Sequence, residues 1–196
     1  MRGHHPGNVL GYHGTSGAVA EVIVHGRGRK PLEPSTKSYD WLGRGIYFWE
    51  NSQQRAEHWA EKQHPRDSAV IGAVIQLGHC LDLLDQRFID LVGEAATAMC
   101  GPYRKQGRTI PRNTKIGAHR FDCALIDFIR NEPPDRFGGP YDSARAAYIE
   151  GKSILGRSAF HRRTHIQIAV YNKNCIKGYF WPAEESLETS SVPLGD

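Results

Sequence analysis

Short apolar segments at irregular intervals constrain the fold of this chain more than any other feature of its sequence. Alternating or continuous apolar runs predict strands at 8–13, 45–49, 69–77, 80–83, 165–171 and 175–181. Apolar residues at helical spacing predict helices at 15–25, 52–64, 85–99 and 121–129. Because the strands do not alternate regularly with the helices, this order favours an α+β fold over a doubly wound parallel sheet.

Two segments lack any sustained period and are expected to be loops. Residues 27–43 contain Gly, Pro, Ser and Lys, and residues 131–140 are rich in Pro and Gly. The first is longer than most connections in compact domains, and loops of that length are often functional. The 196 residues suffice for one domain with its own core, which we place at 1–181. Residues 182–196, with their Ser, Glu and Pro, are expected to form a flexible tail.

Composition excludes several classes of protein. Eight Tyr, seven Phe and four Trp exclude disorder throughout the chain. No window approaches the roughly 18 consecutive apolar residues of a membrane span, and the first residues lack the apolar run of a signal peptide. We therefore expect a cytoplasmic protein with no membrane partner.

Cysteine and histidine give no pattern for a metal site. The four cysteines are far apart and lie in apolar stretches, so they are expected to be reduced core residues. The ten histidines likewise show no ligand spacing.

Positive charge is unevenly distributed along the chain. The formal net charge is +4, but residues 101–168 contain 13 Lys or Arg against 6 Asp or Glu, a local surplus of seven. Such a surplus could attract the phosphates of a nucleotide or of a nucleic acid. An ordinary solvated surface would explain it equally well.

Three polar positions interrupt or end predicted strands. His13 ends a strand and precedes Gly14, where the lack of a Cβ lets a flat ligand approach the backbone. Tyr47 lies in a strand bracketed by Gly45 and two further aromatic residues, and it offers a stacking face. Gln167 lies inside an apolar strand, where an amide requires a partner. Taken singly, each is more simply explained as a structural residue.

Taken together, these positions resemble a known family. The chain reads His-Gly-Thr at 13–15, Gly-Arg-Gly-Ile-Tyr-Phe at 43–48 and Gln-Ile-Ala-Val-Tyr-Asn at 167–172. It thereby resembles ADP-ribosyltransferases of the diphtheria-toxin and poly(ADP-ribose) polymerase type, which carry His-Gly-[Ser/Thr], a Gly-x-Gly-Ile-Tyr-Phe strand and a late-strand Glu. The register places Gln167 at the position of that Glu.

The resemblance implies a fold and a set of ligand contacts. The fold is a split β-sandwich, two small sheets flanked by helices, with a cleft for NAD+ as the ADP-ribose donor. His13 would bind the adenosine ribose, the backbone of Gly14 would hold the nicotinamide amide, and Tyr47 would stack on the nicotinamide ring. The loop 27–43 matches the family's donor loop, with basic residues toward the pyrophosphate. The implied cofactor-binding set is His13, Gly14, Thr15, Arg27, Arg29, Arg44, Tyr47 and His58, with no metal.

The resemblance also implies a reaction, and the chain departs from the family at one catalytic position. The bond between nicotinamide and ribose breaks through a cation-like ribose, and the family's Glu binds the ribose and helps to deprotonate the acceptor. Gln167 keeps hydrogen-bonding capacity but cannot act as a base. His165 on the same strand face, or more weakly Glu150, could serve instead. Alternatively the acceptor needs no base, the activity is reduced, or the protein is inactive.

The function that we expect is mono-ADP-ribosylation of a macromolecule. The basic segment 104–163 favours a nucleic acid, such as RNA, over a protein as acceptor. A single catalytic domain of this size resembles a bacterial toxin or defence effector, whose partners would include an antitoxin or inhibitor protein. The alternatives are an inactive module that binds a nucleotide or a partner, and an NAD+ glycohydrolase.

Overall fold

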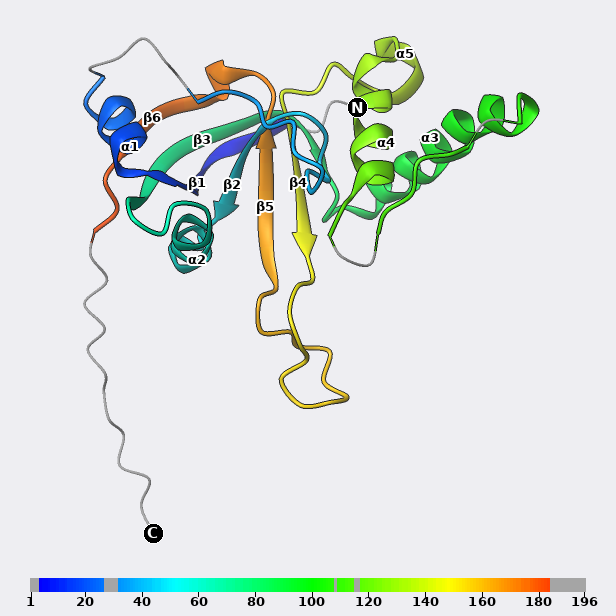
Figure 1. The fold of residues 1–196 in the computed structure, drawn as a ribbon. Coiled ribbons are helices and arrows are strands. Elements are labelled where there is room, and N and C mark those ends of the chain that lie inside the picture. The colour runs from blue at the N-terminus through cyan, green and yellow to red at the C-terminus, as the bar shows by residue number, and fades with distance from the viewer. Residues whose placement is uncertain (1–3, 27–31, 108, 115–116, 184–196) are drawn as a thin grey trace.

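One six-stranded mixed sheet with helices on its flanks forms the fold (Figure 1). The computed structural model describes residues 4–26, 32–107, 109–114 and 117–183. The strands are β1 (His4–Ser16), β2 (Ile46–Glu50), β3 (Ser68–Asp82), β4 (Ser143–Tyr148), β5 (His165–Val170) and β6 (Ile176–Phe180). Their order in the sheet is β1-β2-β5-β4-β3-β6, with a further pairing between β1 and β3. The expected mixture of strands and helices is confirmed.

The long strand β3 joins the two halves of the sheet. Most of it pairs antiparallel with β1 and β6, whereas its last residues, 80–82, pair in parallel with β4. The sequence predicted two strands here, at 69–77 and 80–83. They are one strand, which passes through Gly78 at a φ of +64°. All six strands therefore belong to one hydrogen-bonded sheet rather than to two separate small sheets.

The sheet curls around a common apolar core. Phe48 of β2, Ile71 and Ile75 of β3, and Ile168 and Val170 of β5 belong to one buried cluster. Strands from both halves of the sheet therefore face each other across it. In Figure 1, β4 and β5 accordingly run across the direction of β3.

A second core lies between the sheet and the helices α3 (Gln86–Lys105) and α4 (Arg120–Asn131). Leu125 and Ile129 of α4 pack there with Leu81, Ala144 and Ala169 of the sheet. The short helix α5 (Pro134–Phe137) follows α4 and contributes to the same core through Phe137. These three helices lie together on one side of the sheet in Figure 1.

The helices α1 (Gly17–Val24) and α2 (Gln53–Gln63) cover the other side (Figure 1). The Ser16 hydroxyl accepts a hydrogen bond from the Val19 N–H at 3.4 Å and caps the start of α1. A turn of 3-10 helix, η1 (Lys173–Cys175), precedes β6. None of the helices in the described residues has both the length and the apolar character needed to cross a membrane.

Three further features differ from the sequence prediction. The strand β4 was not predicted, because its residues Ser-Ala-Arg-Ala-Ala-Tyr contain no β-branched side chain and only one aromatic. The helix expected at 85–99 continues to Lys105, with Pro102 inside it. All four cysteines are free, as expected, but only three are buried and Cys123 is partly exposed.

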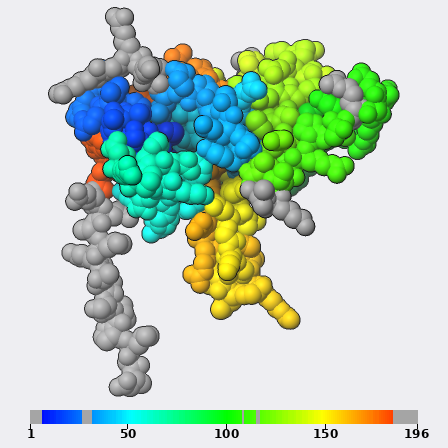
Figure 2. Space-filling view, viewed as in Figure 1, coloured from blue at the N-terminus to red at the C-terminus, as the bar shows by residue number. Residues whose placement is uncertain are grey.

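The connection between β4 and β5, residues 149–164, extends beyond the body of the molecule. Figure 2 shows it as a narrow yellow-to-orange projection. Backbone hydrogen bonds cross its base, from the Arg162 N–H to the Lys152 carbonyl and from the Arg163 N–H to the Glu150 carbonyl. The projection is therefore ordered by its own backbone.

Candidate functional site

Strand alternation places Tyr47 and Gln167, two of the predicted site residues, on one face of the sheet. In β2 and β5, Phe48 and Ile168 point into the apolar core, so Tyr47, Trp49 and Gln167 point the other way. Trp49 pairs directly with Gln167 in the register of these strands. The face opposite the core is therefore aromatic and polar.

A cleft of about 1130 Å³ opens over this face. It is lined by the end of β1, by α2, by part of the segment 33–41 and by side chains of β2, β4 and β5. His13, Tyr47 and Gln167 all line it, although they come from strands far apart in the chain. Gly14, Thr15 and His58 line it as well. The structure thus brings together most of the residues that the sequence singled out.

The His13 ring is held as a neutral hydrogen-bond acceptor. Its Nδ1 lies 2.8 Å from the carbonyl oxygen of Tyr47. Because a carbonyl only accepts, Nδ1 carries the proton, which leaves Nε2 with a lone pair. Burial lowers the pKa of His13, an effect that the hydrogen bond to the Tyr47 carbonyl opposes. The side chain can therefore accept a hydrogen bond from a ligand hydroxyl.

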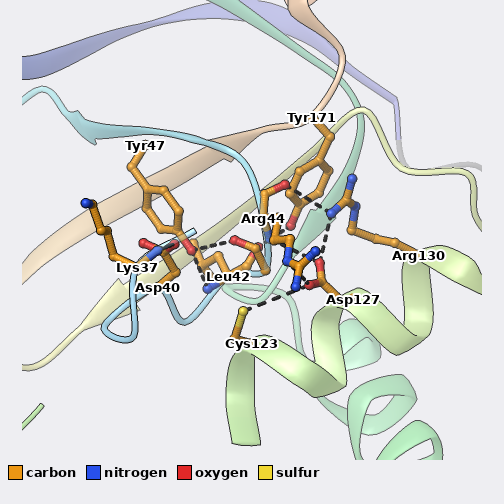
Figure 3. Close-up of polar contacts among 10 residues, drawn as sticks. Lys37, Asp40, Leu42, Arg44, Tyr47, Cys123, Asp127, Arg130 and Tyr171 are labelled. Atoms are coloured by element: carbon orange, nitrogen blue, oxygen red, sulfur yellow. Dashed lines mark hydrogen bonds and ion pairs between the residues drawn. The ribbon is translucent and has the colours of Figure 1, made fainter. Parts of the chain in front are cut away.

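The Tyr47 hydroxyl is fully used within the protein (Figure 3). It accepts a hydrogen bond from the Leu42 N–H at 2.9 Å and donates one to the Gly43 carbonyl at 2.8 Å. Burial raises the pKa of Tyr47 far above its ordinary value. Only the ring is therefore left for a ligand, and the hydroxyl serves to hold the segment before β2.

Trp41 orients the Gln167 amide. The indole Nε1–H of Trp41 donates to Oε1 of Gln167. Because an indole N–H can only donate, the amide oxygen must face Trp41 and the NH₂ group must face elsewhere. Gln167 is only partly buried and lines the cleft. It therefore presents a donor to the cleft where a carboxylate would present an acceptor.

Packing against α2 explains the glycine at position 14. A Cβ built there would lie 2.4 Å from the carbonyl oxygen of Ala56 and 3.0 Å from the backbone N of Ala60. Real side chains do not approach backbone atoms so closely, so α2 could not pack on β1 with any other residue here. The structure therefore gives close packing as one reason for Gly14, and the approach of a flat ligand stays a prediction.

Aromatic rings form one wall of the cleft. Trp59 of α2 packs on Trp49, with ring centroids 5.7 Å apart, and on Tyr39 at 5.1 Å. His58, which the family resemblance implied as a cofactor-binding residue, is exposed at the cleft surface. The aromatic surface that α2 presents to the cleft is that of Trp59.

Charged groups meet at the end of the cleft formed by α2 and the β4–β5 connection. Arg55 of α2 donates to Oε2 of Glu150 at 2.7 Å, and Arg163 approaches Oε1 of the same carboxylate at 3.7 Å. The Arg55 side chain is only 12% exposed, so the carboxylate neutralises a largely buried cation. All three residues line the cleft.

Two predicted site residues lie away from the cleft. His165 is 7% exposed and its Nδ1 hydrogen-bonds the Arg163 carbonyl, which leaves Nε2 buried with no partner among the described residues. Arg44 is 71% exposed at its side chain and forms an ion pair with Asp127 (Figure 3). Arg27 and Arg29 lie outside the described residues. Neither His165 nor Arg44 is therefore placed to touch a ligand in the cleft.

Sequence reasoning missed Trp41, Trp49 and Tyr148, all of which line the cleft. Trp49 could have been found by alternation, because it lies two residues after Tyr47 on the same strand face. Tyr148 lies on the unpredicted strand β4, and no sequence pattern links Trp41 to its distant partner Gln167. Within the described residues, no three His, Cys, Asp or Glu side chains gather as metal ligands.

Comparison with protein-family models, with curated proteins and with solved structures found no match to this chain.

Proposed function

We propose that this protein binds NAD+ in the cleft and transfers its ADP-ribose to a macromolecular acceptor, releasing nicotinamide. The observation that carries the proposal is the convergence of His13, Tyr47 and Gln167, from three separate strands, on one cleft. Each is the counterpart of a signature residue in the family that the sequence resembles. Strands β2, β3 and β5 share one core, as the layers of a split sandwich would, although all six strands belong to one sheet.

The geometry of His13 and Tyr47 suits the binding of NAD+, the ADP-ribose donor. The bare Nε2 of His13 can accept a hydrogen bond from a ribose hydroxyl. The Tyr47 ring, fixed through its hydroxyl, offers a flat face to the nicotinamide ring. A volume of about 1130 Å³ is slightly above the roughly 300–1,000 Å³ of ordinary small-molecule pockets, which leaves room for part of an acceptor.

The β4–β5 connection favours a nucleic acid as acceptor. Part of the basic surplus in the sequence is used inside the protein, since Arg145 pairs with Glu50 and Asp82 and is not free to bind phosphate. Lys152, Arg157 and Arg162 are instead exposed on the projection beside the cleft. Phosphates of a single strand lying along it would meet these cations.

Incubation with labelled NAD+ tests the proposal. The purified protein is mixed with the donor and, in separate arms, with RNA, single-stranded DNA or protein, and each acceptor is analysed by mass spectrometry. An added mass of one ADP-ribose on an acceptor, with an equal amount of nicotinamide released, is the expected result. The Tyr47→Ala variant, which lacks the stacking ring, should release none. Absence of nicotinamide release in every arm at high enzyme concentration would refute the transferase.

The donor-presenting amide of Gln167 favours a second candidate, a module that binds the nucleotide without turning it over. In that case calorimetry would detect NAD+ binding that depends on His13 while nicotinamide release stays absent. Release of free ADP-ribose alone would instead identify a glycohydrolase.

A further inference from the structure

The β4–β5 connection brings a carboxylate to the side of the cleft where β5 presents an amide. Glu150 comes two residues after Tyr148, the last residue of β4. In the pairing of β4 with β5, Tyr148 lies opposite His165 and Ala146 lies opposite Gln167. Burial lowers the pKa of His165, and Glu150 lies close enough to oppose that shift. Glu150 therefore lies opposite Arg163, on the strand face of Gln167 but four residues farther along, and it lines the same cleft.

Gln167 leaves a chemical requirement unmet in the proposed reaction. Breaking the nicotinamide–ribose bond develops positive charge on the ribose, which a nearby negative charge stabilises. Because Trp41 turns the NH₂ of Gln167 toward the cleft, this residue presents partial positive charge there. Neither charge stabilisation nor removal of the acceptor's proton can come from it.

Among the described carboxylates of the cleft, Glu150 combines a fixed position with an oxygen, Oε1, that makes no hydrogen bond. Both carboxylate oxygens of Asp40 accept hydrogen bonds, from the Ser35 hydroxyl and the Lys37 N–H, and the residue is 2% exposed. Glu33 reaches away to Lys173. The free nitrogen of His165 is buried. Among the described acidic residues of the cleft, this leaves Glu61 on α2 and Glu150, and it is Glu150 that Arg55 holds in place.

We propose that Glu150 is the catalytic carboxylate, which stabilises the ribose cation and takes the proton of the acceptor. This inference rests on the proposed function. Arg55 holds Oε2 at 2.7 Å, whereas Oε1 is 3.7 Å from the partly exposed Arg163. Arg55 thus positions the carboxylate, and Oε1 is the oxygen with capacity for a ligand.

The step balances without any further reactant. A lone pair of the acceptor oxygen or nitrogen forms a bond to C1′ of the ribose. The bond from C1′ to the nicotinamide nitrogen breaks, and its electron pair leaves with nicotinamide, which becomes neutral. The proton of the acceptor passes to Oε1 of Glu150 and from there to water.

The test compares the wild type with Glu150→Gln, which keeps an oxygen for Arg55 but removes the charge. Nicotinamide release is measured in the presence of the acceptor, and NAD+ affinity by calorimetry. We expect the turnover of E150Q to fall at least about 100-fold, with the NAD+ dissociation constant changed less than threefold. Glu132→Gln serves as the matched control, because Glu132 is another Arg-paired carboxylate and lies outside the cleft lining. It should keep the wild-type rate.

A double variant separates chemistry from structure. In E150Q/Q167E, a carboxylate returns to β5, and turnover should recover at least tenfold over E150Q. Wild-type turnover in E150Q would overturn the inference, and so would a loss of NAD+ affinity equal to the loss of turnover. If the wild type neither binds NAD+ nor releases nicotinamide, the proposed function fails and the inference fails with it.

Discussion

Replacing Tyr47 with Phe separates two roles of this side chain. The substitution keeps the ring that faces the cleft and removes the hydroxyl that ties down the segment before β2. That hydroxyl accepts from the Leu42 N–H and donates to the Gly43 carbonyl. Leu42 is fully buried, so water cannot replace the lost partner of its N–H.

The cost follows from the two groups left without a partner. An unsatisfied buried donor or acceptor costs roughly 1–3 kcal/mol, and a carbonyl at the lower end of that range. We therefore expect Tyr47→Phe to lower the free energy of unfolding by about 3 kcal/mol. For a chain of this size that corresponds to a fall in Tm of roughly 6–12 °C.

Urea denaturation followed by tryptophan fluorescence measures this loss. Tyr39→Phe is the matched control, because Tyr39 is 40% exposed and its hydroxyl makes none of the hydrogen bonds found in the described residues. It should change stability by less than about 0.5 kcal/mol. A loss below about 1 kcal/mol in Tyr47→Phe would refute the reasoning. So would a loss of NAD+ binding as complete as that of Tyr47→Ala at a temperature where Tyr47→Phe is folded.

Three further predictions concern packing, pH and orientation. Gly14→Ala should destabilise the fold by at least about 2 kcal/mol in urea titrations, because its Cβ meets the backbone of α2. Gly93 of α3 has open space around it, so Gly93→Ala should instead stabilise the fold by about 0.5–1 kcal/mol. Because burial lowers the pKa of His13, its contribution to stability should be complete above the ordinary histidine pKa of 6.5. That contribution should fall as the pH drops below 6.5, by up to about 1.4 kcal/mol per pH unit. His13→Asn should reduce the slope, and the buried His165, whose pKa is also lowered, should account for a remaining part. Trp41→Phe removes the hydrogen bond that orients the amide of Gln167, so kcat for nicotinamide release should fall about tenfold while KM for NAD+ changes less than threefold. An unchanged kcat would show that the orientation of this amide is unimportant.

Residues whose place depends on a local pattern could be predicted from the sequence. Alternation within β2 and β5 is a period of two, so the side of the sheet that Tyr47 and Gln167 occupy follows once Phe48 and Ile168 are assigned to the core. The family motifs further predicted that His13 would belong to the same site as Tyr47 and Gln167. The structure places all three on one cleft.

Residues whose place depends on distant contacts could not be predicted. Trp41 meets Gln167 across 126 positions of the chain, and Arg55 meets Glu150 across 95. No local period links such pairs, and an ion pair or an indole hydrogen bond leaves no spacing in the sequence. For the same reason Gly14 was explained by a ligand, although the backbone that excludes a side chain there belongs to α2.

The His13, Tyr47 and Gln167 side chains each have one hydrogen-bonding atom occupied by a protein partner. The groups that remain free are complementary to only a narrow class of ligand. Nδ1 of His13, the hydroxyl of Tyr47 and Oε1 of Gln167 all have protein partners. A ligand therefore meets one acceptor nitrogen, one aromatic face and one NH₂ donor. It must offer a hydroxyl or N–H to the first, a flat ring to the second and an oxygen or ring nitrogen to the third. A dinucleotide with a ribose hydroxyl, a pyridine ring and ribose oxygens offers all three groups. A carboxylate at position 167 in place of the amide would change only the last requirement, because the ligand would then have to donate a hydrogen bond there instead of accepting one.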